Sequence, residues 1–86
     1  MKDLQDLKDY LDDIITWQAY AKFKRVLGKT ESLIFDIALF AFYKQKVNIT
    51  QEEIAKELEV NKSTISKNIK GIQKKWEQYK IDNNLN

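Results

Sequence analysis

The sequence contains no cysteine and no histidine, and these two absences remove much of the chemistry available to a small protein. Without cysteine there is no disulfide framework and no thiolate metal site, which fits a protein of the reducing cytoplasm. Without histidine the chain lacks the commonest metal ligand and the commonest general base. It also has no glycine-rich loop that could cradle a phosphate group. We therefore predict that the protein is not an enzyme, with no catalytic residues, no metal site and no cofactor.

Proline is also absent, and the only glycines are Gly28 and Gly71. This scarcity of helix-breaking residues, together with abundant lysine, glutamate, leucine and isoleucine, predicts an all-α protein. At 86 residues the chain is long enough for one small core, so we expect a single domain over residues 1–86. The longest apolar run, residues 37–43, is too short to cross a membrane, and the acidic start of the chain does not resemble a secretion signal.

A long first helix is predicted over residues 3–27. Its first apolar residues recur at helical spacing: Leu4, Leu7, Leu11 and Ile14. Gly28 is expected to end this helix as a left-handed cap. A helix of this length in so small a protein either reaches beyond its own core to pair with a second chain or packs across the other helices of the same chain. The sequence leaves both alternatives open.

A second helix is predicted over residues 31–46, after a cap at Thr30. Residues 33–43 are apolar almost all round, and a helix that is hydrophobic on every side is expected to be buried on every side. This segment is therefore predicted to be the central helix of the core. Asp36 is the only charge in the run and is expected to face a gap or a basic partner.

Residues 50–70 have the pattern of two short helices joined by a tight turn. Thr50 and Glu53 are spaced as a capping box at the start of the first of these helices. Its narrow apolar face consists of Ile54, Ala55 and Leu58. The turn is expected at residues 59–61, with Val60 pointing into the core and the Asn61 side chain capping the next helix.

The last helix is expected to continue well past Lys70. Its apolar residues keep spacings of four, three, four and three: Ile65, Ile69, Ile72, Trp76 and Tyr79. This stripe can dock on the first helix or form a dimer seam. Gly71 is expected to mark a bend or a close helix crossing. No alternating β-branched run follows, so a β-hairpin wing is not expected.

The stretch TQEEIAKELEVNKSTISKNIK, residues 50–70, resembles the helix-turn-helix of bacterial transcription regulators. It is most similar to the form found in the fourth region of sigma factors and in sigma-like phage or plasmid regulators. Glu59 stands where the motif commonly has glycine, and a positive φ there would cost on the order of 1 kcal/mol. The resemblance implies DNA binding. With the helices expected above, it predicts a four-helix helix-turn-helix domain with long N-terminal and C-terminal helices and no wing.

The net charge of +2 is distributed unevenly along the chain. Residues 50–60 carry four glutamates and one lysine, whereas residues 61–80 carry six lysines and one glutamate. The basic block begins where the expected recognition helix begins. A polyanion is therefore the expected partner of that helix.

We predict that double-stranded DNA is bound with the start of the last helix in the major groove. Lys62, Ser63 and Lys67 are expected to read base edges, while the start of the preceding helix contacts phosphates. The predicted DNA-binding residues are Thr50, Gln51, Asn61, Lys62, Ser63, Thr64, Ser66, Lys67, Lys70 and Lys74. Because one such module buries little surface, a homodimer is expected. The resemblance implies a small transcriptional regulator.

Two other functions fit the same sequence. The first is a helical protein-interaction module that binds RNA polymerase or another regulator through Trp17, Tyr20 and Trp76. The second is DNA packaging or plasmid segregation, in which the same motif serves without regulating transcription. An interaction module would show no salt-dependent DNA binding, whereas the sequence does not separate a packaging protein from a regulator.

Overall fold

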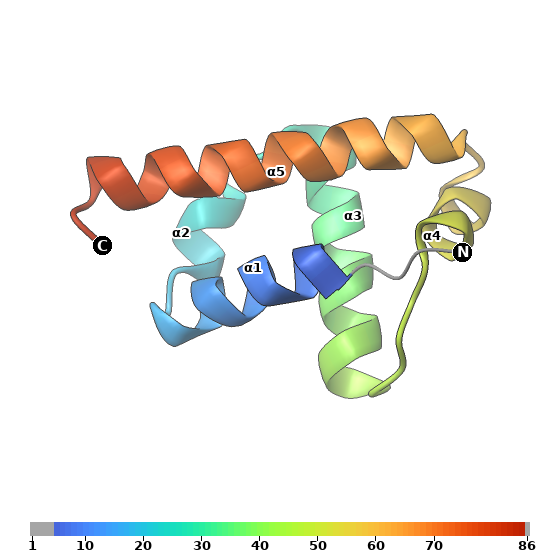
Figure 1. Cartoon of the computed structure of the whole chain (residues 1–86), viewed down its shortest axis with the longest axis horizontal. Helices are drawn as coiled ribbons and strands as arrows, with labels where there is room; N and C mark the ends of the chain where they lie inside the picture. The colour runs from blue at the N-terminus through green and yellow to red at the C-terminus, as the bar shows by residue number, and fades with distance from the viewer. Residues whose placement is uncertain (1–4, 86) are drawn as a thin grey trace.

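The computed structural model describes residues 5–85, which form a set of packed helices (Figure 1). The elements are α1 (Gln5–Thr16), α2 (Tyr20–Lys24), α3 (Lys29–Leu39), the π-helix η1 (Phe40–Lys44), α4 (Gln51–Leu58) and α5 (Lys62–Asp82). The longest helix, α5, runs along the top of Figure 1 and packs on α1, α3 and α4. No strand occurs in residues 5–85, and the predicted all-α fold is confirmed.

The segment predicted as one helix over residues 3–27 forms two helices, so that prediction was wrong. Residues 3–4 lie outside the described part of the chain. Helix α1 ends where Gln18 adopts a left-handed conformation (φ 52°), and the Ala19 N–H donates to the Ile14 carbonyl at 3.1 Å. The early apolar spacing would place the next apolar residue at position 18, which is glutamine. The apolar pattern instead resumes at Ala19 and Phe23, which are both buried, and the chain turns to bring them to the core.

Gly28 begins α3 instead of ending the first helix. Its φ is −70°, so the predicted left-handed cap is wrong. The Gly28 N–H donates to Glu31 Oε1 at 2.7 Å, which satisfies a backbone group that the helix itself leaves free. Thr30 lies inside the first turn of α3, so the predicted cap at Thr30 is also wrong. The carboxylate of Glu31 performs the capping from within the helix.

Aromatic side chains form the centre of the core. Trp76 of α5 has no exposed surface, and its ring centroid lies 5.1 Å from that of Phe23 in an edge-to-face arrangement. Phe23 also meets Phe35 of α3 edge to face at 6.0 Å, and Tyr79 stacks on Trp76 at 5.5 Å. These contacts join α2, α3 and α5. They also remove Trp76 from the protein-contact surface that the sequence suggested with Trp17 and Tyr20.

Helix α3 lies at the centre of the fold but is not buried on every side, so that expectation was wrong. Ile34, Phe35 and Ala38 have no exposed surface. On the other side, Leu33 is 45% exposed and Phe40 is 55% exposed. The part of the chain that the structure describes contains too few helices to cover a helix of this hydrophobicity all round.

Asp36 has a basic partner, which was one of the two alternatives expected from the sequence, and the partner lies in the same chain. Lys24 Nζ is 2.6 Å from Asp36 Oδ2, and the Tyr20 hydroxyl donates to Oδ1 at 2.8 Å. The bond to Asp36 raises the pKa of Lys24, while burial and the carboxylate together raise the pKa of Tyr20. These polar contacts link α2 to α3 beside the aromatic core.

The C-terminal half of α5 docks on α1. Asp13 Oδ2 accepts hydrogen bonds from Trp76 Nε1 at 2.8 Å and Lys80 Nζ at 2.9 Å, and the Tyr10 hydroxyl donates to Glu77 Oε1 at 2.8 Å. Burial of Asp13 opposes its charged form, but the bonds from Lys80 and Trp76 outweigh burial and lower the pKa of the carboxyl. Of the alternatives left open by the sequence, the structure shows packing within one chain.

Candidate nucleic-acid interface

Helix α4 begins with the predicted capping box. The Glu53 N–H donates to Thr50 Oγ1 at 3.2 Å, and the Thr50 N–H donates to Glu53 Oε1 at 3.1 Å. The Thr50 hydroxyl also donates to Glu53 Oε1 at 3.0 Å. Thr50 therefore shapes the start of the helix, and the partly buried Gln51 follows it as the first helical residue. The other N–H groups of this first turn have no partner within the helix, and such groups commonly bind phosphate.

The turn between α4 and α5 requires a left-handed residue, as the sequence suggested. Glu59 has φ 55° and ψ 44°, and the Val60 N–H donates to the Ala55 carbonyl at 3.0 Å in a Schellman-type closure. Ala55 is buried against α5, consistent with a close crossing of the two helices. Val60 is 38% exposed, so its predicted burial is wrong. The backbone hydrogen bond holds the turn without that side chain.

Asn61 occupies the N-cap position of α5, but its side chain makes no capping hydrogen bond. Its carbonyl accepts from the Thr64 N–H at 3.0 Å and the Ile65 N–H at 3.3 Å. The predicted side-chain cap was therefore wrong. The exposed Asn61 amide is left available to an external partner at the start of α5.

Helix α5 has a buried side and an exposed side with different compositions. Ile65, Ile69, Ile72 and Trp76 are buried. Ser63, Lys67, Lys70 and Lys74 are exposed and follow one another at spacings of four, three and four residues, which places them on one face. We call these four residues the outer stripe. Thr64 and Ser66 are partly buried along its margins, and Lys62 is exposed on the flank toward α4.

The lysines of α5 fall into two groups. Lys62 pairs with Glu52 at 3.4 Å, Lys75 with Glu31 at 2.6 Å and Lys80 with Asp13 at 2.9 Å. In contrast, no ion pair within residues 5–85 involves the three lysines of the outer stripe, Lys67, Lys70 and Lys74. The positive charge that remains uncompensated on α5 is therefore concentrated on the outer stripe.

Glu31 is a residue of this region that sequence reasoning missed. Its side chain is only 12% exposed, and Oε1 accepts from both the Gly28 N–H and Lys75 Nζ. A Cβ at position 71 would overlap Glu31 Oε2, so Gly71 marks a close approach, as predicted. The approaching group is a side chain of α3, and it fixes the middle of α5 on the fold. Only the tertiary structure brings these residues together.

The described residues include no group of three or more His, Cys, Asp or Glu residues placed to hold a metal ion. Among residues 5–85 there is also no helix with both the length and the hydropathy needed to span a bilayer.

The short helix α4, the left-handed turn at Glu59 and the following helix α5 define a helix-turn-helix protein. A family model described as an HTH domain matches residues 36–83, which is more than half of the chain. The chain belongs to this family of DNA-binding helix-turn-helix domains. Comparisons with curated proteins and with solved structures gave no match.

Proposed function

We propose that the protein is a sequence-specific DNA-binding protein that acts as a small transcriptional regulator in the cytoplasm. The observation that carries this proposal is the outer stripe, in which three lysines without ion pairs share one face of the second helix of the motif. Uncompensated lysines on an exposed helix are suited to the phosphates and guanine edges of DNA. The resemblance of residues 50–70 to regulators of the sigma and phage or plasmid kind supports a role in transcription.

In this proposal the N-terminal half of α5 enters the major groove. Ser63 and Lys67 lie nearest the start of the outer stripe and read base edges, whereas Lys70 and Lys74 lie farther along and contact phosphates. Asn61, Thr64 and Ser66 flank the stripe and contact the walls of the groove. Across the motif, Gln51 and the backbone at Thr50 bind a phosphate.

Lys62 needs separate treatment because it already pairs with Glu52. Both side chains are about half exposed, and an exposed pair of this kind contributes roughly 0.2–1 kcal/mol. A base or phosphate contact can replace a bond of that strength. While the pair lasts, Lys62 also neutralises a carboxylate at the start of α4, which would otherwise repel DNA. We therefore assign Lys62 a secondary role in base reading.

A homodimer completes the proposal. Two copies related by two-fold symmetry would present two copies of α5 to half-sites about one turn of DNA apart. The second copy increases the contact surface, which a single small module lacks.

The test begins by selecting a preferred duplex from a random pool and measuring affinity by fluorescence anisotropy. We expect Lys67→Ala to cost about 1–3 kcal/mol on the selected duplex and much less on a scrambled one. Lys74→Ala should weaken binding to both duplexes about equally. Lys22→Ala is the matched control, since Lys22 is exposed on α2 and makes no ion pair within the described residues.

Equal losses on the two duplexes for Lys67→Ala would contradict its assignment to a base edge. Failure of the wild-type chain to bind any duplex at low salt would overturn the proposed function. It would favour the interaction module that binds RNA polymerase or another regulator.

A further inference from the structure

One ion pair joins the two helices of the helix-turn-helix. Lys62 Nζ, at the start of α5, lies 3.4 Å from Glu52 Oε1, in the first turn of α4. Among residues 5–85 no other ion pair connects α4 with α5. The two residues are ten positions apart in the sequence, and the left-handed turn at Glu59 brings them together. A carboxylate is therefore held at the edge of the surface that the proposed function assigns to DNA.

Stabilisation of the fold does not account for the position of Glu52. The start of α4 is already capped by Glu53 through Thr50. The side chains of Glu52 and Lys62 are each about half exposed, so their pair contributes little to stability. Glu52 also follows Gln51, which is proposed to bind a phosphate. A carboxylate at this position repels the DNA backbone, and it therefore weakens binding to any DNA that offers it no hydrogen-bond donor.

The ion pair matches the hydrogen-bonding pattern of a G·C base pair. In the major groove guanine presents the acceptors N7 and O6, and its paired cytosine presents the N4 amino group as a donor. The pair of Glu52 and Lys62 presents the complementary arrangement, a cationic donor 3.4 Å from an anionic acceptor. Lysine donates to guanine, and glutamate accepts from cytosine N4. An A·T pair instead presents the thymine methyl group at this edge, which does not suit a charged side chain.

We propose that Glu52 is a specificity-determining residue, which accepts a hydrogen bond from cytosine while Lys62 donates to the guanine of the same base pair. This inference rests on the proposed function and adds to it a residue that the sequence did not indicate. On DNA without a G·C pair at this position, Glu52 has no donor, keeps Lys62 from the phosphates and repels the backbone. Glu52 thus favours the preferred site largely by weakening binding elsewhere.

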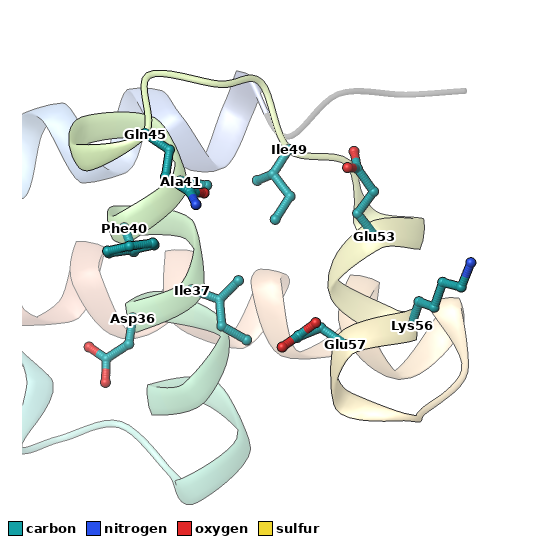
Figure 2. A pocket seen from close by; sticks show the side chains of 9 residues that line it. All are labelled: Asp36, Ile37, Phe40, Ala41, Gln45, Ile49, Glu53, Lys56 and Glu57. Atoms are coloured by element: carbon teal, nitrogen blue, oxygen red, sulfur yellow. The ribbon is translucent and has the colours of Figure 1, made fainter.

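A second glutamate of α4 provides a matched control. Glu57 is exposed and forms no ion pair within the part of the chain that the structure describes. It lines a hollow between α3 and α4, and Figure 2 shows its side chain pointing toward Ile37 of α3. Positions 52 and 57 are about 140° apart around the helix. Glu57→Ala therefore removes the same charge from the same helix as Glu52→Ala, but on a different side.

The test compares the two alanine variants on the duplex that the wild type selects and on a scrambled duplex, by fluorescence anisotropy. Glu52→Ala is expected to bind the scrambled duplex about three- to tenfold more tightly, because Lys62 becomes free for a phosphate and the repulsion is lost. The ratio of the two affinities should fall by about tenfold. Glu57→Ala should change each affinity by less than about twofold. Circular dichroism should show that both variants keep the helical fold.

A repeated selection from the random pool tests the base assignment. The wild type is expected to prefer a G·C pair at one position where Glu52→Ala relaxes the preference, while the other positions keep theirs. The inference would be overturned if Glu52→Ala kept every base preference, bound the scrambled duplex no more tightly than the wild type, or gained no more affinity than Glu57→Ala. In each of these cases the wild type still selects a duplex, so the proposed function stands. A wild type that binds no duplex would overturn both.

Discussion

The two halves of α5 have similar numbers of lysines but use them differently. In the C-terminal half, Lys75 and Lys80 pair with Glu31 and Asp13, and Trp76 fills the core. In the N-terminal half, Lys67 and Lys70 are exposed without ion pairs in the described structure, and Lys62 forms only an exposed pair with Glu52. Lys74, at the start of the C-terminal half, continues the unpaired outer stripe. One continuous helix therefore combines a C-terminal half held in the fold by Lys75, Trp76 and Lys80 with an exposed face of unpaired lysines that is available for binding. Charge alone does not identify a binding surface, because a lysine already paired within the fold is less available to a partner.

The largest expected loss of stability tests the C-terminal half of α5, which packs into the fold. Trp76→Ala should reduce the free energy of unfolding by about 3–5 kcal/mol, because it removes a fully buried indole and its hydrogen bond to Asp13. Chemical denaturation followed by circular dichroism measures this loss. A domain of this size has a total stability of only about 4–13 kcal/mol, so Trp76→Phe serves as a milder second variant.

An alanine substitution in the outer stripe should leave the free energy of unfolding nearly unchanged. Lys67→Ala removes an exposed side chain without an ion pair in residues 5–85, and the expected change in unfolding free energy is below about 0.5 kcal/mol. A loss comparable to that of Trp76→Ala would show that Lys67 stabilises the fold and is not simply an exposed residue available for binding.

A smaller change, an increase in the free energy of unfolding, is expected for a substitution in the turn between α4 and α5. Glu59→Gly should raise the unfolding free energy by about 1 kcal/mol, because Glu59 has φ 55° and glycine adopts this conformation without steric cost. Glu59→Ala removes the same charge but keeps the strained backbone, so it should give no comparable gain. Thermal denaturation of the wild type, Glu59→Gly and Glu59→Ala distinguishes the effect of the backbone conformation from the effect of the lost charge. A gain of equal size from Glu59→Ala would attribute the effect to charge instead of backbone.

The helix-turn-helix was the most predictable part of the fold because its signals are local. The capping box of Thr50 and Glu53 and the left-handed turn at Glu59 involve residues close together in the sequence. The break after α1 was missed, although glutamine at position 18 interrupts the apolar spacing there. A pattern that resumes in a new register can indicate two helices instead of one.

The sequence could not predict which lysines of α5 are free of ion pairs and so available to bind a partner. Lys75 and Lys80 lie in the same basic block as Lys67 and Lys70, but their partners Glu31 and Asp13 are far away in the chain. Only packing of α5 on α1 and α3 brings these charges together. The exposure of Leu33 and Phe40 was not predicted for a related reason, because an apolar helix does not reveal which of its sides the rest of the chain leaves uncovered.

The most direct test of the central claim is the salt dependence of DNA affinity for two charge-matched double variants. Lys67→Ala/Lys70→Ala removes two lysines from the outer stripe, and Lys22→Ala/Lys46→Ala removes two exposed lysines from α2 and the loop before α4. The slope of log affinity against log salt should fall in magnitude by about 1.8 for the first variant and remain near the wild-type value for the second. Equal slopes for the two variants would contradict the assignment of the outer stripe to DNA.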